Sequence, residues 1–219
     1  MRTVNANVKL ARNWTVKRVR RCLDKNQKHE LVRFLDERYR ERFFDPITCL
    51  RSAENNERGF GFAIMALCCL LIETLECYRE GLPTSHPRDL KDLCDGLDKK
   101  EILKRCGEIN PTGSEKVFEN FFNCEKHRDF FPGVNGAMFY EKIRCGLLHQ
   151  AQTKGGWRIG RRGSFWDANK NEPGINRDEF CDRLNACFSA FLDELRTNEM
   201  TEHPWPNVKQ KICWLVETS

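Results

Sequence analysis

The sequence lacks the features that mark secreted, zinc-binding and membrane-spanning proteins. No Cys-x2-Cys pair occurs among its 12 cysteines, although structural zinc sites usually carry such pairs. The longest apolar run, residues 61–72, is short of the ~20 residues that cross a bilayer. The first residues lead into basic side chains without the apolar core of a secretory signal. We therefore expect a cytoplasmic protein with no membrane contact, no metal and no cofactor.

The cysteines are interpreted as free thiols. Several lie in apolar helical patterns, where a reduced cysteine packs as a small hydrophobe. These are Cys68, Cys69, Cys77, Cys145, Cys181 and Cys187. Disulfides are rare in a reducing cytoplasm, so the same interpretation fits the expected location.

The composition is that of a folded protein with a mild positive charge. Of 219 residues, 40% are hydrophobic and 32% are charged, which excludes a disordered tail. A net charge of +5 favours a polyanionic partner only weakly, so the placement of the basic residues matters more than their number.

Apolar spacing predicts a mainly α fold, in one domain with a core at about residues 57–195. An N-terminal helix at 14–44 should end at Asp45-Pro46, because the residue before proline avoids helical geometry. A helix at 57–79 is apolar nearly all round, which indicates a central helix or a dimer contact. Further helices are expected at 89–97, 99–106, 112–122, from 137 to the glycines at 155–156, and at 176–195. A short β-hairpin is expected within 157–166, and a C-terminal extended arm at 196–219.

One predicted helix combines a guanidinium and an imidazole in an apolar segment. The stretch Phe139–Gln150 carries Arg144 and His149 five positions apart. A guanidinium grips phosphate in a fork, and an imidazole can transfer a proton near neutral pH. Five residues of α-helix separate two side chains by about 140° and ~7.5 Å, so the pair can border a common groove.

The Arg-x4-His spacing, with a long helical pattern before it and a polar basic loop after it, resembles the HEPN superfamily. The resemblance covers residues 57–153 and implies a HEPN-like helical bundle, commonly dimeric, acting as a metal-independent endoribonuclease in defence, stress or toxin–antitoxin systems. It implies that His149 is the general acid or base and that Arg144 holds the scissile phosphate. The ribose 2′-hydroxyl would then attack phosphorus and leave a 2′,3′-cyclic phosphate.

Three further residues are candidates for supporting this site. Tyr140 shares a helical stripe with Arg144, and Gln150 follows His149, so either could orient the phosphate or the imidazole. Glu73 follows the apolar run of the 57–79 helix and could pair with Arg144. The alternative for Glu73 and Glu76 is a solvated helix end.

Gly146 interrupts the same helix at a cost of about 1 kcal/mol relative to alanine. A close approach by another helix would explain a glycine here. HEPN dimers cross near the motif, so we expect a second copy of the chain at this position.

The loop after the motif helix is the expected RNA contact. Its cations are Lys154, Arg158, Arg161 and Arg162. Trp157, Phe165 and Trp166 lie between them, and we favour their anchoring the hairpin over stacking on bases. The remaining histidines, His29, His86, His127 and His203, have the surroundings of surface residues.

Two alternatives to an endoribonuclease stay open. The same dimeric fold could bind RNA or a protein, including an antitoxin or regulatory partner, without catalysis. A DNA-binding regulator is disfavoured because no helix-turn-helix pattern is found and the net charge is modest.

Overall fold

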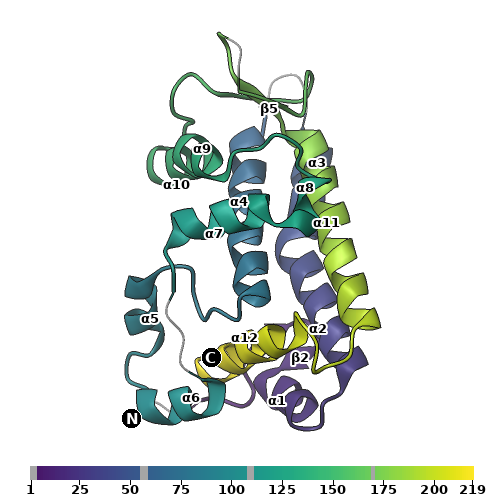
Figure 1. The fold of residues 1–219 in the computed structure, drawn as a ribbon, viewed down its shortest axis with the longest axis vertical. Coiled ribbons are helices and arrows are strands. Elements are labelled where there is room, and N and C mark those ends of the chain that lie inside the picture. Colours follow the sequence, from purple (N-terminus) through teal and green to yellow (C-terminus); the bar gives the residue numbers. More distant parts are fainter. Residues whose placement is uncertain (1–3, 55–58, 108–110, 169–170) are drawn as a thin grey trace. The chain divides into compact units, whose positions relative to one another are not determined.

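The computed structural model describes residues 4–54, 59–107, 111–168 and 171–219. The expected mainly α fold is confirmed, with a small strand pair and one small sheet among the helices (Figure 1). The elements in chain order are β1 Lys9–Ala11, β2 Trp14–Thr15, α1 Val16–Asp24, α2 Lys28–Tyr39, η1 Arg40–Phe44, α3 Asp45–Ser52, α4 Gly61–Arg79, α5 Pro87–Leu93, α6 Lys99–Cys106, α7 Ser114–Asn123, α8 Glu125–Arg128, α9 Gly136–Phe139, η2 Tyr140–Arg144, α10 Cys145–Gln150, β3 Arg158–Gly160, β4 Trp166–Asp167, β5 Gly174–Asn176, α11 Arg177–Thr197 and α12 Trp205–Glu217.

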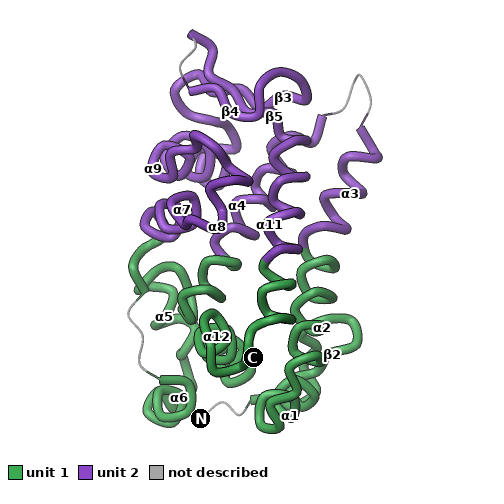
Figure 2. Tube along the Cα trace, turned by 45° about the vertical axis from the view of Figure 1, so that its right-hand side comes forward, with its two compact units in different colours: residues 1–42, 74–114, 191–219 green, residues 43–73, 115–190 purple. Residues whose placement is uncertain are grey.

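The chain divides into two compact units, coloured separately in Figure 2. Unit 1 consists of residues 1–42, 74–114 and 191–219, and unit 2 consists of residues 43–73 and 115–190. Because unit 1 is assembled from three separate stretches, long-range contacts decide its core. The expected single HEPN-like domain stays a prediction.

Unit 1 contains a cluster of sulfur and aliphatic side chains around Trp214. Cys94, Ile102 and Cys106 are buried against Trp214, and leucines of α5 and α6 pack around them. The short helices at α5 and α6 were predicted at nearly these bounds, and they are part of the core of this unit.

Unit 2 has an aromatic core. The predicted helix at 112–122 is confirmed as α7, and its apolar stripe supplies Phe118, Phe121 and Phe122. Phe139 and Phe180 stack on one another with ring centroids 5.3 Å apart. Packed aromatic rings bury large areas, so this core fixes the start of the motif helix.

The expected N-terminal helix is three helices. It breaks at Asn26, whose φ of +48° is left-handed, and α2 begins after it. The expected stop at Pro46 is wrong, because the chain passes through a π-turn at η1 directly into α3. Proline lacks an amide hydrogen and crowds the carbonyl four residues earlier, and a wider turn just before it relieves both problems.

The expected β-hairpin within 157–166 is also wrong. Strands β3 and β4 form there, but they flank β5 in a three-stranded sheet of order β3-β5-β4. β5 is parallel to β3 and antiparallel to β4. Alternation within the segment could not show that a strand beyond residue 170 would insert between the two.

The C-terminal segment forms helix α12 where an extended arm was expected. Pro206 lies in the first turn of the helix, where a proline costs no hydrogen bond. Buried positions recur along α12 at Trp205, Val208 and Ile212, which is helical spacing.

Helix α4 forms as predicted and ends where Gly81 adopts a φ of +70°. The expected start at Glu57 lies outside the described residues. By length and composition α4 could cross a membrane, although 61% of its most apolar window is buried inside the protein. The expectation of a mostly buried helix is confirmed, but Phe62 and Leu70 remain 45% and 42% exposed.

Candidate functional site

The motif segment folds as a helix with a π-turn in its middle. Asn135 caps its start, since its side-chain oxygen accepts a hydrogen bond of 2.8 Å from the amide of Met138. The π-turn covers Tyr140–Arg144, and the amide of Cys145 bonds to the carbonyl of Tyr140. Such turns are rare and recur at functional sites. No proline follows this one, in contrast to the π-turn before Pro46.

Arg144 is held by Glu73, which was one of the two alternatives that the sequence left open for this carboxylate. One terminal nitrogen, Nη2, lies 3.2 Å from each carboxylate oxygen of Glu73. The two side chains are only 15% and 10% exposed. Burial by itself would lower the pKa of Arg144, but the charge of Glu73 and the hydrogen bond raise it by more. Arg144, the last residue of η2, is therefore a cation held in place by Glu73 of α4.

Tyr140 lies beside Arg144, as their shared stripe predicted. The guanidinium carbon is 5.5 Å from the centre of the tyrosine ring, which is within cation–π range. Burial and a hydrogen bond with Cys145 raise the pKa of the Tyr140 hydroxyl. Tyr140 is thus an uncharged aromatic side chain that packs beside the guanidinium of Arg144.

His149 lies at the opposite, solvent-exposed end of α10. Its neighbours Leu148 and Gln150 are exposed as well. The helix ends directly after them, because Ala151 adopts a left-handed φ of +52°. Within the described structure no hydrogen bond or ion pair engages the imidazole. Among the described residues, Arg144 and His149 therefore share no contacting residue within one chain. Gln150 follows His149 in sequence, and the described structure gives no contact between their side chains.

The expectation for Gly146 is corrected. A Cβ atom at this position would collide with the carbonyl oxygen of Gln152 and lie 3.0 Å from the Cα of Thr153. The chain turns back over the helix there, and the amide of Lys154 donates to the carbonyl of Lys142 at 2.9 Å. The close neighbour that Gly146 permits is its own loop, so the glycine is no argument for a dimer.

Searches among known proteins supply no relative. No protein-family model, curated protein or solved structure matches this chain. Its function therefore has to be argued from its own residues.

Two of the four loop cations are partly neutralised. Arg158 pairs with Glu172 at 2.7 Å, and Arg161 lies 3.3 Å from Asp178. Arg162 is exposed, with no ion pair to the described residues, and Lys154 is half-buried. These residues keep a net positive charge, but a smaller one than the sequence suggests.

The aromatic residues of this loop anchor the sheet, as favoured from the sequence. Trp157 and Phe165 are 6% and 9% exposed. The rings of Trp157 and Trp166 lie 4.4 Å apart, and Trp166 also contacts Phe139. Trp157 and Phe165 are therefore covered and do not offer a free face for base stacking.

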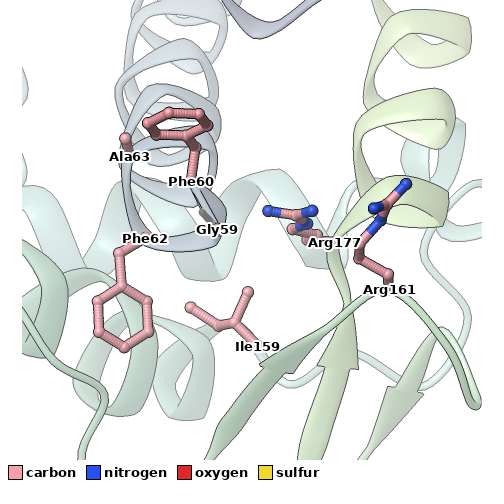
Figure 3. A pocket seen from close by; sticks show the side chains of 8 residues that line it. Gly59, Phe60, Phe62, Ala63, Ile159, Arg161 and Arg177 are labelled. Atoms are coloured by element: carbon pink, nitrogen blue, oxygen red, sulfur yellow. The ribbon is translucent and has the colours of Figure 1, made fainter. Parts of the chain in front are cut away.

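A cavity of about 590 Å³ opens beside Arg161 (Figure 3). Phe60, just before α4, and Phe62 in its first turn line one side of it, and Arg161 and Arg177 line the other (Figure 3). Arg177 is buried and forms two hydrogen bonds to Glu54, which lowers the pKa of that carboxyl. Nothing in the sequence singles out Arg177 or Glu54, because their pairing spans 123 positions.

The expectation for one histidine is wrong. His127 is 4% exposed, and its Nδ1 lies 2.8 Å from the carbonyl oxygen of Phe121. It packs in the aromatic core of unit 2 and is a satisfied core histidine. Among the described residues no three histidine, cysteine, aspartate or glutamate side chains come close enough to hold a metal ion.

Proposed function

We propose that this protein is a metal-independent endoribonuclease of the HEPN type, with Arg144 and His149 as its catalytic residues. The observation that carries the proposal is the contrast between the two side chains. Arg144 at the end of η2 is held by Glu73 and packs beside Tyr140, while His149 is exposed near the end of α10, which follows directly. A fixed cation suits phosphate binding, and an accessible imidazole suits proton transfer.

The chemistry follows from these roles. His149 as a base removes the proton of the ribose 2′-hydroxyl, the oxygen attacks phosphorus, and the bond to the 5′-oxygen of the next nucleotide breaks. A protonated imidazole returns the proton to that leaving oxygen. Arg144 stabilises the negative charge that develops on the phosphoryl oxygens. The products are a 2′,3′-cyclic phosphate and a 5′-hydroxyl, and DNA is inert because it lacks the nucleophile.

We propose a homodimer formed through α4 and α10. Among the described residues, the large apolar side chains that stay exposed are Phe62, Leu70 and Leu148. They belong to the helices that carry Glu73 and His149. Exposed apolar side chains on a functional helix favour a partner surface. A second copy covering Leu148 would bring further residues next to His149.

RNA would be gripped next to this helix. Lys154 lies where the loop folds back on Lys142, and Arg162 has no competing carboxylate among the described residues. Arg158 and Arg161 could exchange their carboxylate partners for phosphates, since these pairs are exposed and weak. The resemblance places such nucleases in defence, stress or toxin–antitoxin systems, where an antitoxin or regulatory partner would control them.

The test uses purified full-length protein and single-stranded RNA with EDTA present. Cleavage should leave cyclic-phosphate ends, and His149→Ala should lower the rate by ~10²–10⁴-fold. His203→Ala is the matched control, because His203 is exposed but lies outside the motif helix. Equal activity of His149→Ala and the wild type would refute the assignment.

A non-catalytic binding module is the second candidate, and one observation favours it. The Arg144–Glu73 pair is nearly buried, so it has a structural role without any RNA. In that case RNA or a partner protein binds through the basic loop and no cleavage occurs. RNA binding that is lost in Arg162→Ala, with no cleavage under any condition, would favour this function. Growth inhibition on expression, relieved by His149→Ala, would favour the nuclease.

A further inference from the structure

Two cysteines in unit 1 lie closer than any ordinary contact between thiols. The sulfur of Cys106, the last residue of α6, is 2.6 Å from the sulfur of Cys213 in α12. An S–S bond is about 2.05 Å long, so a shift of about half an ångström would join them. The two residues are 107 positions apart in sequence, and nothing in their spacing indicates the contact.

The two sulfurs differ in accessibility. Cys106 is 4% exposed, in the cluster around Trp214, whereas Cys213 is half-buried. Both line a cavity of about 430 Å³, which also carries Arg20, Arg105 and Glu217. A small oxidant can therefore reach the sulfur of Cys213 from the cavity, whereas the sulfur of Cys106 is buried next to it.

The close contact between the two sulfurs favours a thiolate at the accessible position. The contact with Cys106 lowers the pKa of the Cys213 thiol, and Arg105 and Arg20 act in the same direction. Burial and Glu217 oppose them. Thiolates rather than thiols attack oxidants, so Cys213 is the sulfur that reacts first.

We propose that Cys106 and Cys213 form a dithiol that a peroxide oxidises to a disulfide, linking α6 to α12. The Cys213 thiolate attacks one peroxide oxygen, an S–O bond forms, the O–O bond breaks, and the departing oxygen leaves as water after protonation. The resulting sulfenic acid is attacked by the sulfur of Cys106. The S–S bond forms, the S–O bond breaks, and a second water leaves. Two electrons pass from the thiols to the peroxide.

A second close pair provides an internal comparison. The sulfurs of Cys68 and Cys181 lie 3.4 Å apart, but these side chains are 0% and 5% exposed. The hydrogen bond with Cys181 raises the pKa of the Cys68 thiol, and burial raises it further. Proximity is present in both pairs, but only the Cys106–Cys213 pair has a partly exposed sulfur with a lowered pKa, that of Cys213.

The experiment follows both pairs in the folded full-length protein. Reduced protein is treated with hydrogen peroxide, remaining thiols are alkylated, and peptides are mapped without reduction by mass spectrometry. The Cys106–Cys213 cross-link should form at least tenfold faster than any Cys68–Cys181 cross-link. Dithiothreitol should reverse it, and oxidation should raise the melting temperature of the wild type.

Variants separate the two steps. Cys106→Ser should leave a sulfenic acid at Cys213 that dimedone traps, and Cys213→Ser should lose both the cross-link and the rise in melting temperature. Cys49→Ser, an exposed position in α3, is the matched control and should oxidise like the wild type. The proposal is overturned if folded wild-type protein keeps Cys213 as alkylatable after peroxide as before, or if the Cys68–Cys181 link forms first. The wild-type map decides this even if a variant fails to fold.

Discussion

Replacing Glu73 by glutamine should destabilise the protein by about 3 kcal/mol. The substitution keeps the shape of the side chain and removes the charge that faces Arg144. Removing one partner of a buried ion pair typically costs about 3–5 kcal/mol, because the other charge is left without compensation. The two side chains are 10% and 15% exposed, so water can reach them slightly and the lower end applies. For a chain of this length, that loss corresponds to a fall of about 6–12 °C in melting temperature.

The assay is thermal unfolding of Glu73→Gln followed by circular dichroism. Glu141→Gln is the control, because Glu141 pairs with Lys142 at 2.7 Å but is 60% exposed, and it should leave the melting temperature nearly unchanged. Combining Glu73→Leu with Arg144→Met should recover much of the loss, since an apolar pair of similar volume avoids burying charge. A cost for Glu73→Gln no larger than that of Glu141→Gln would show that Arg144 is not held in this way.

Two further substitutions test other parts of the structure. Burial raises the pKa of Glu76 to about 8, with Glu80 adding to the effect and Arg79 opposing it. Because folding favours the protonated form of Glu76, its contribution to the free energy of unfolding is present below pH ~4.5 and is lost as the pH rises toward 8. Glu76→Gln should therefore stabilise the protein by up to about 5 kcal/mol at pH 8.5 and little at pH 4.5, measured by urea unfolding at each pH. Gly146→Ala should cost about 1–3 kcal/mol and make the loop at residues 152–154 more sensitive to protease, because the new methyl meets Gln152. Loss of a dimer with unchanged stability would instead restore the partner interpretation of Gly146.

The contact between Arg144 and Glu73 was one of two alternatives that the sequence left open, although it spans 71 positions. A guanidinium within an apolar segment needs a counter-charge, and Glu73 is the first carboxylate after the apolar run of α4. Tyr140 followed in the same way from helical spacing. Burial and charge balance therefore identified Glu73 as a candidate partner, and the structure decided between the two alternatives.

The neighbour of Gly146 could not be predicted because it depends on the backbone of Ala151. The left-handed turn there returns the chain over α10, and no sequence rule requires alanine to adopt it. The prediction that His127 lies at the surface was wrong for a related reason. Its neighbours Glu125, Lys126 and Arg128 are charged and indicate a surface, yet one side of that short helix faces Phe121.

Pairing across long separations also escaped prediction. β5 lies between β3 and β4 because hydrogen bonds form outside the segment whose alternation was visible. Cys106 lies on α6, which was expected as a helix, whereas Cys213 lies on α12, where an extended arm was expected. Their contact could not be predicted. Sequence patterns specify which face of an element is apolar, but not which distant element covers it.

The π-turn at Tyr140–Arg144 changes what a sequence interval means in space. It adds about one residue to a turn, so side chains upstream of Arg144 are rotated relative to those of α10, and Tyr140 reaches both Arg144 and Cys145. A regular α-helix of the same sequence, without the π-turn, would present a different side of Tyr140 to Arg144. Proteins that share only the spacing between an arginine and a histidine can thus differ in the side chains that contact the guanidinium. Motif alignments identify equivalent neighbours of the arginine only when the backbone conformation is matched as well.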